Sequence, residues 1–318
     1  MANLPRIGVV LSSGGVRGVY AHTGFLLALE RLGIPITAAA GCSAGAVVGG
    51  IMASGADLHV WSETLARVDR KRFWTPDSLP YVLWQVVVRK GRGYAGLSGT
   101  EAAVDFCRSQ LAVQTFEECR YPFHILALSL GRGSKVIFSE GELAPRMMAS
   151  AAMPVLYRPV EINGDWYCDG AIVDLAPMDA ICCKQGLDAL IIHHVAMRRE
   201  GQRDIACILQ RPWSMLEILE RLLFRQRPWY LSDDRMTFHR CPCHCGAAVI
   251  VIEPRLPELL WPMTEGGPQV QASAKEQTEI LLRSYLEALL SEPRSRLPVS
   301  SAANDRTSKV KGATCEPA

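Results

Sequence analysis

The sequence lacks two features that would direct a protein to a membrane interior or to nucleic acid. Its 318 residues contain no run near the roughly eighteen uninterrupted apolar residues that a membrane-spanning helix needs. It also has no excess of one charge, because 34 Lys and Arg residues nearly balance 32 Asp and Glu residues. A strong basic field is therefore absent, and we predict no nucleic-acid partner.

The N-terminus also lacks the pattern of a secretory signal. Its apolar run, Ile7–Leu11, is too short for the hydrophobic part of a signal peptide, and a glycine-rich loop follows where a cleavage site would stand. We therefore expect a cytoplasmic protein whose eleven cysteines are mostly reduced thiols. The chain length and the 49% apolar content allow a large buried core.

The most informative pattern present is Gly41-Cys42-Ser43-Ala44-Gly45. It follows the apolar residues 34–40 and precedes the small apolar residues 46–53, so it predicts a strand, a tight turn and a helix. A nucleophile elbow has this order, with glycines around the nucleophile because the turn has no room for side chains. A small-residue turn with no catalytic role fits the pentapeptide alone, so the surrounding sequence must decide.

A glycine-rich loop precedes this pentapeptide by one predicted strand–helix–strand unit. The loop, Gly14-Gly15-Val16-Arg17-Gly18, follows the strand Ile7–Leu11 and opens a helix that extends to residue 32. In a parallel unit the loop and the elbow lie at the same edge of the sheet. The loop N–H groups and that of Ala44 then suit an oxyanion hole beside Ser43. A nucleotide-binding loop fits less well, because Ser13 occupies the first glycine position and no Lys-Ser/Thr pair follows.

Two kinds of base are available to a nucleophilic serine. Asp188 and the pair His193-His194 allow the Ser-Asp-His order of a catalytic triad. The other candidate is Asp169, which follows an apolar strand and precedes Gly170 and Ala171, so its carboxylate lies at a sharp turn. An ordinary turn aspartate fits this local sequence equally well.

Three blocks together resemble the signature of patatin-like phospholipases, in the order of that family. They are the glycine loop at residues 14–18, the pentapeptide at residues 41–45, and Asp169-Gly170-Ala171. Residues 29–34, 116–118 and 149–154 also resemble the family, and the similarity covers about residues 6–195. The resemblance implies an α/β fold with three layers, α/β/α, around a central, largely parallel sheet.

The same resemblance implies the chemistry. Ser43 is expected to be the nucleophile and Asp169 its base, in a Ser-Asp dyad that needs no histidine, with the glycine loop as the oxyanion hole. The expected substrates are phospholipids or related acyl lipids, and no cofactor or metal is expected. The alternatives are a soluble ester or thioester hydrolase with the same dyad, or a catalytically silent lipid-binding protein.

The sequence departs from the family pattern at three positions. Ser13 replaces the usual first glycine of the loop, Cys42 replaces a common threonine, and Leu175 stands where asparagine is frequent. None of these changes removes a catalytic group. Ser13 would alter the loop if its position requires a positive φ, and this is the only feature that favours the silent lipid-binding protein.

Beyond the signature blocks we expect a catalytic core over residues 6–200, a C-terminal helical extension of the same domain over residues 201–290, and a disordered tail over residues 291–318. Amphipathic helices are predicted over residues 212–223 and 274–290. Trp- and Arg-bearing segments at residues 61–92 and 212–230 are candidates for peripheral contact with a membrane. The sequence predicts neither a lipid headgroup nor an oligomeric state.

The segment His239-Arg240-Cys241-Pro242-Cys243-His244-Cys245 contains five potential metal ligands. Zinc sites usually place two or more residues between paired cysteines and take a second pair from elsewhere in the chain. This spacing does not match, so free thiols in a loop are favoured and no metal is expected.

Overall fold

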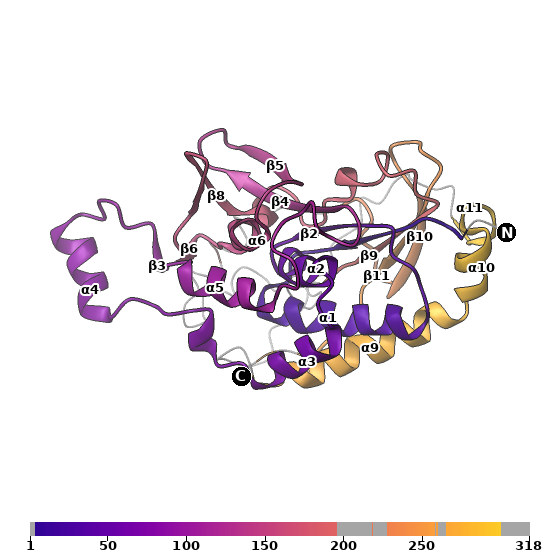
Figure 1. Cartoon of the computed structure of the whole chain (residues 1–318), viewed down its shortest axis with the longest axis horizontal. Helices are drawn as coiled ribbons and strands as arrows, with labels where there is room; N and C mark the ends of the chain where they lie inside the picture. The colour runs from indigo at the N-terminus through magenta and orange to yellow at the C-terminus, as the bar shows by residue number, and fades with distance from the viewer. Residues whose placement is uncertain (1–3, 196–217, 219–227, 258, 260–264, 300–318) are drawn as a thin grey trace, which may run out of the picture.

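The computed structural model describes residues 4–195, 218, 228–257, 259 and 265–299. Its centre is a mixed sheet of nine strands (Figure 1). These strands are β1 (Ile7–Leu11), β2 (Ala38–Cys42), β4 (Phe123–Ser129), β5 (Ser134–Phe138), β7 (Val160–Ile162), β8 (Asp165–Asp169), β9 (Ala189–His193), β10 (Met236–Arg240) and β11 (Ala248–Ile252). Their order is β10-β11-β9-β1-β2-β4-β8-β7, and β5 also pairs with β4.

The middle of the sheet is parallel. Strands β11, β9, β1, β2 and β4 all run in one direction, and β5, β7, β8 and β10 pair antiparallel towards the sides. Every residue of β1, β9 and β11 is buried, as expected for parallel strands covered on both faces. The predicted fold class, α/β with a central, largely parallel sheet flanked by helices, is confirmed.

Helices cover one face of this sheet (Figure 1). They are α1 (Gly15–Arg31), α2 (Ala44–Ser54), α3 (Leu58–Arg67), α5 (Glu101–Gln110), α6 (Leu143–Ala151) and α9 (Gly267–Arg283). Helices α1 and α9 lie side by side, and they approach so closely that a Cβ at Gly24 would overlap the backbone carbonyl of Gln271. The core on this face contains Phe25 of α1, Val9 of β1 and Ile51 of α2, together with apolar side chains of α9.

The other face is covered differently. Val10, Ile192 and Val249 pack against residues 176–187 and Tyr230. Residues 170–180 contain two short 3-10 turns, η3 (Gly170–Ile172) and η4 (Met178–Ala180). The chain that follows Asp169 therefore forms part of the second covering layer.

The remaining short elements lie between α3 and β7. They are η1 (Arg70–Arg72), α4 (Leu79–Leu83), the π-helical turn η2 (Trp84–Val88), and the two-stranded pair β3 (Gly96–Ser98) and β6 (Val155–Tyr157). Helix α4 projects from the body of the molecule (Figure 1).

The C-terminal part corrects three expectations. The segment predicted to be a helical extension contributes β10 and β11 to the central sheet, because the apolar residues 247–252 form a buried strand beside β9. The predicted helix over residues 274–290 is divided into α9 and α10 (Leu286–Ser291). Of the tail over residues 291–318 that we expected to be disordered, residues 291–299 contain the short helix α11 (Pro293–Arg296) and a buried Leu297. Residues 300–318 lie outside the described residues.

Two further expectations concern amphipathic and membrane segments. The amphipathic helix predicted over residues 212–223 lies outside the described residues apart from residue 218. Within the described part of the chain, no helix is both long and apolar enough to cross a membrane.

Candidate active site

Ser43 lies in a tight turn between β2 and α2. Its backbone has φ 53° and ψ −117°, a conformation that is strained for any residue except glycine. A Cβ at Gly41 would overlap the backbone of Gly45, and a Cβ at Gly45 would overlap the carbonyl of Leu11. The turn therefore has no space for a side chain at either glycine, and it presents the Ser43 hydroxyl at the N-terminus of α2.

The sheet topology brings Asp169 to this turn. Strand β4 pairs with β5 on one side, and on its other side it pairs first with β2 and then with β8. Because β2 and β8 run in opposite directions, their C-terminal ends meet along β4, where Cys42 pairs with Leu126 and Asp169 pairs with Ala127. Two residues 126 positions apart in the chain are thus adjacent in space.

The side chains of Ser43 and Asp169 form a buried hydrogen-bonded pair. The Ser43 hydroxyl donates to Oδ2 of Asp169 at 2.8 Å, and the N–H of Ala171 donates to Oδ1 at 2.9 Å. Ser43 is 5% exposed and Asp169 is 1% exposed. Ala171 and Gly170 form η3, so this turn fixes the orientation of the carboxylate.

Burial makes the Asp169 carboxylate a stronger base than an exposed one. Loss of solvation raises its pKa from 3.8 to about 6, although the hydrogen bonds from Ala171 and Ser43 act in the opposite direction. The carboxylate is still mostly ionised at neutral pH. It is therefore able to accept a proton from the serine hydroxyl that it contacts.

Two helix N-termini converge on Ser43. Gly15 and Val16 begin α1 and Ala44 begins α2, and no side chain caps either helix. First-turn N–H groups have no acceptor within their own helix, and helix dipoles favour negative charge at this end. All three residues line the same cavity as Ser43 and Asp169. The arrangement suits stabilisation of an oxyanion.

The other loop residues hold this arrangement together. Gly14 caps α1 and accepts the N–H of Gly18, and Arg17 lies in the first turn of the helix. A Cβ at Gly18 would stand 2.9 Å from that of Ala44, so the absence of a side chain there lets α1 and the elbow pack closely.

Ser13 fits the loop without strain. It is buried, its φ is not positive, and its N–H donates to the carbonyl of Leu175 at 2.9 Å. Ser13 and Leu175, two of the three positions that depart from the family pattern, are thus joined by a backbone hydrogen bond. The one feature that favoured a silent protein does not distort the loop.

Ser150 lies at this site, although the sequence alone gave it no role. Its buried hydroxyl, on α6, accepts the backbone N–H of Ser43 at 2.8 Å. It lies in the small-residue segment 149–154, which resembled the family without an assigned role. A polar residue among alanines and methionines was the available signal.

The alternative triad is not assembled. His193 is buried at the end of β9, with its Nδ1 at 2.8 Å from Nδ1 of His22. Asp188 lies before the opposite end of β9 and accepts a hydrogen bond from Arg294 at 2.9 Å. Among the described residues, Asp169 is the hydrogen-bond acceptor of the Ser43 hydroxyl, and no histidine contacts that hydroxyl.

The dyad opens onto an apolar cavity of about 280 Å³. Aromatic and aliphatic side chains from several elements form most of its wall. They include Val19, Tyr20, Trp61, Phe73, Phe106 and Leu156. A cavity of this character suits an apolar ligand such as a hydrocarbon chain.

Comparison with known proteins identifies relatives of this chain. The family model described as patatin-like phospholipase matches residues 9–181. An NTE family protein of Mycobacterium bovis is 33% identical over 179 residues, which are 56% of this chain and 46% of that protein. A lysophospholipase of Cryptococcus neoformans is 29% identical over 185 residues, which are 55% of this chain and 10% of that protein. The chain thus spans at most about half the length of these relatives.

One solved structure supports the fold. Human GIVD cytosolic phospholipase A2, in complex with the inhibitor methyl gamma-linolenyl fluorophosphonate, superposes with a TM-score of 0.50. The match covers 92% of this chain and 60% of the human chain at 12% sequence identity. At this identity the likeness concerns the arrangement of helices and strands.

Proposed function

Because the chain belongs to the patatin-like phospholipase family, we propose that it is a lipid acyl hydrolase that uses Ser43 and Asp169 as a catalytic dyad. The substrates proposed are fatty acyl esters of phospholipids or related lipids. The observation that carries the proposal is the 2.8 Å hydrogen bond from Ser43 to Asp169, placed at the wall of an apolar cavity.

In the first half of the proposed reaction, the Ser43 hydroxyl attacks the ester carbonyl while its proton moves to Oδ2 of Asp169. The tetrahedral oxyanion accepts hydrogen bonds from backbone N–H groups at the starts of α1 and α2. The C–O bond to the alcohol then breaks, and Asp169 returns its proton to the departing alkoxide. An acyl ester of Ser43 remains.

In the second half, water attacks the acyl ester and gives its proton to Asp169. The new tetrahedral intermediate uses the same N–H groups, and its collapse releases the fatty acid as Ser43 recovers its proton. One carboxylate therefore acts as base and acid in turn, which explains why the dyad requires no histidine.

The cavity supports a preference for long acyl chains. Its wall is mainly apolar, and each methylene group that a substrate buries contributes about 0.8 kcal/mol. We therefore expect kcat/KM to rise with acyl length until the cavity is filled, and a soluble-ester enzyme would show no such rise.

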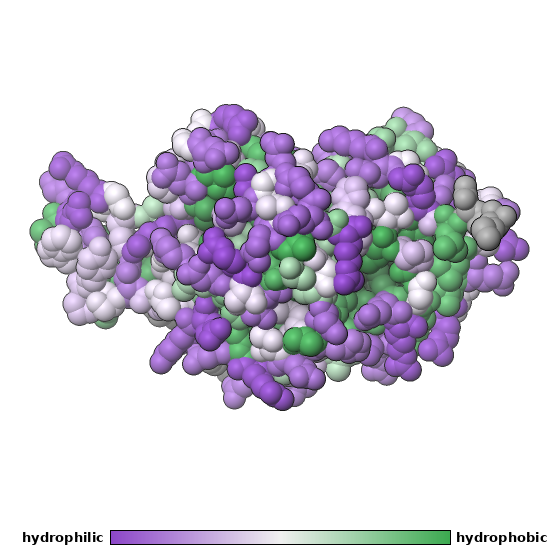
Figure 2. Space-filling view, viewed as in Figure 1, coloured by the Kyte–Doolittle hydropathy of each residue, from purple (hydrophilic) through white to green (hydrophobic). Residues whose placement is uncertain are grey.

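The segment 79–92 supports action at a membrane surface. It projects from the body of the molecule (Figure 1), and it follows closely in the chain after Phe73 and Trp74, which line the cavity. Its apolar side chains are largely exposed, and these are Leu79, Leu83, Trp84, Val86, Val87 and Val88. On the face seen in Figure 2, the projecting part of the molecule shows hydrophobic and hydrophilic residues together.

Basic residues follow directly on this apolar stretch. Arg89, Lys90 and Arg92 are exposed, and the Arg89 guanidinium lies 5.6 Å from the centre of the Trp84 ring. Apolar insertion combined with cationic contacts is the combination that holds a peripheral protein on anionic lipid. We call residues 79–92 the projecting arm and assign it to peripheral membrane contact.

A covalent serine-hydrolase probe tests the dyad. The wild-type chain is expected to be labelled, Ser43→Ala is expected to lose all labelling, and Asp169→Asn is expected to lose most of it. Circular dichroism establishes that each variant is folded. A wild-type chain that takes no label would support a catalytically silent lipid-binding protein. Hydrolytic activity equal to that of wild type in either variant would contradict the proposed dyad.

Vesicle co-sedimentation tests the projecting arm. The double variant Val87→Asp, Val88→Asp is expected to lose binding and hydrolysis of anionic vesicles, and to keep its activity on a short soluble ester. Ile280→Asp is the matched control, because Ile280 is as exposed as Val88, each at 64%, but lies on α9. Equal losses in both variants would contradict a specific role of the arm.

A further inference from the structure

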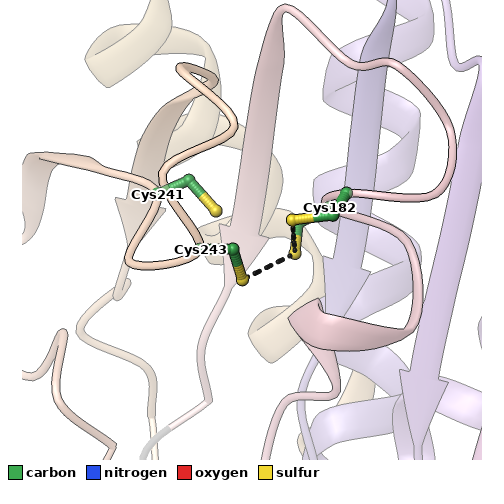
Figure 3. Close-up of side chains that lie close together, drawn as sticks. Cys182, Cys241 and Cys243 are labelled. Carbon is green, nitrogen blue, oxygen red and sulfur yellow. Dashed lines mark hydrogen bonds between the residues drawn. The ribbon is translucent and has the colours of Figure 1, made fainter.

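Four cysteine thiols converge at a place remote from Ser43. Cys182 and Cys183 follow η4, and Cys241 and Cys243 lie in the loop between β10 and β11. Figure 3 shows the side chains of Cys182, Cys241 and Cys243 pointing toward one another. All four sulfur atoms lie within 4.8 Å of one another. The sulfur of Cys182 is 3.3 Å from that of Cys243 and 3.6 Å from that of Cys183.

This grouping supplies the second cysteine pair that a zinc site requires, although the spacing within each pair stays shorter than usual. Cys241 and Cys243 are separated by one residue and lacked a second pair in the linear sequence. The fold supplies that pair from 61 positions earlier in the chain. Two cysteine pairs brought together by the fold are the usual composition of a structural zinc site.

The distances suit a tetrahedral ion. Zinc–sulfur bonds of about 2.3 Å in tetrahedral geometry place neighbouring sulfur atoms roughly 3.8 Å apart. Two of the sulfur pairs, at 3.3 Å and 3.6 Å, and the upper limit of 4.8 Å for the group lie on both sides of that value. A set of thiols without carboxylates selects a thiophilic ion such as zinc over magnesium or calcium.

The position of the cluster excludes contact with the substrate. Ala189 begins β9 and pairs with Ala248, which begins β11, so the chain just before these strands lies at the N-terminal edge of the parallel sheet. Cys183 and Cys243 precede those strands by a few residues. Ser43 follows the C-terminal end of β2, which runs parallel to them, at the opposite edge.

We propose that Cys182, Cys183, Cys241 and Cys243 bind one structural zinc ion. Four protein ligands leave no open coordination position, so the ion supplies no catalytic water. It joins the β10–β11 loop to the segment that leaves Asp169 and covers the second face of the sheet. Cys182 and Cys241 are buried and their two partners are exposed, so the ion enters from the solvent side.

Metal analysis of the full chain tests this site. Protein purified under reducing conditions with added zinc, then freed of loosely bound metal, is expected to hold about one zinc ion per chain. Cys243→Ser is expected to lose most of that zinc. Cys119→Ser is the control, because it removes a half-buried thiol outside the cluster and is expected to keep the full amount.

Cobalt substitution reports the ligands directly. Reconstitution with Co²⁺ is expected to give the intense sulfur-to-cobalt charge-transfer absorption of thiolate ligands and the visible bands of a tetrahedral ion. If Cys243→Ser does not fold, Cys183→Ser and a chelator titration of the wild-type chain give the same readouts. Absence of zinc from reduced, zinc-supplied protein would overturn the proposal, and so would a Cys182–Cys243 disulfide in protein that binds no metal.

Discussion

Replacing Asp169 by asparagine is expected to abolish ester hydrolysis and to make the folded protein more stable at neutral pH. The wild-type carboxylate has a pKa of about 6 in the folded chain because it is buried, against 3.8 when solvated. This difference means that ionised Asp169 costs the folded state about 3 kcal/mol relative to the unfolded state. Asparagine removes the charge and still offers an acceptor to Ala171 and a donor to Ser43.

The pH dependence of this effect has a definite sign. A group whose pKa is raised by folding stabilises the protein most below its unfolded pKa, here 3.8, and that stabilisation is lost as the pH rises through about 6. The wild-type chain therefore carries the full penalty at about pH 8. The advantage of Asp169→Asn in free energy of unfolding should be smaller at pH 5 than at pH 8 by about 1.4 kcal/mol.

Urea unfolding followed by circular dichroism, at those two pH values, measures this advantage. Subtracting wild type from variant cancels the other titrating groups, such as His22 and His194, whose burial lowers their pKa values to about 3 and about 4. Asp165→Asn is the control on the same strand. In the wild-type chain the Ser129 hydroxyl is the main cause that lowers the pKa of Asp165. The ionised Asp165 carboxylate therefore stabilises the fold, and this stabilisation is lost only as the pH falls through the acidic range.

A variant-minus-wild-type difference that stays constant between these pH values would refute the assigned pKa of Asp169. A variant that keeps its hydrolytic activity would refute the assignment of Asp169 as the base. The two results are independent, because one concerns the burial of a charge and the other concerns its chemical role.

Three further predictions follow from the same contacts. For a short soluble ester, kcat/KM should fall roughly tenfold for each pH unit below about 6, because protonated Asp169 accepts no proton; a limb near pH 4 in the rate profile would contradict this. Ser150→Ala should leave the N–H of Ser43 unpaired and lower the free energy of unfolding by about 1–3 kcal/mol in urea unfolding, because an unsatisfied buried donor loses its solvation; a free energy of unfolding equal to that of wild type would show that the contact is dispensable. Gly24→Ala should destabilise the fold by about 2 kcal/mol in thermal unfolding, because its methyl group forces α9 away from α1; a melting temperature equal to that of wild type would show that the two helices separate without cost.

The sequence was most informative where backbone geometry demands particular residue types. Glycines on both sides of Ser43 indicated a turn too tight for side chains, and the structure has no space for a Cβ at Gly41 or Gly45. The parallel strands were recognisable as short apolar runs, because both of their faces are buried. These signals are local, so a linear reading detects them.

Contacts made by tertiary structure were not predictable in the same way. Ser150 and Cys182 gain their partners only when α6 approaches the elbow and the β10–β11 loop approaches η4. The β10–β11 pair was not predicted, because a short apolar run such as residues 247–252 fits a buried strand and part of a buried helix equally well. Because such partners lie far apart in the chain, no local pattern in a single sequence links them.

The end-to-end meeting of β2 and β8 along β4 has a consequence for the tolerance of this fold to change in length. Each strand stops where the other stops, so an added residue at either tip would drive two backbones into the same space. Slipping β8 by one residue would move Asp169 by about 3.4 Å and turn its side chain to the other face of the sheet. Insertions should therefore be tolerated in the exposed turn at Asn163 and Gly164, but not where the ends of β2 and β8 meet. The lengths of these two strands fix the distance between the nucleophile and the base.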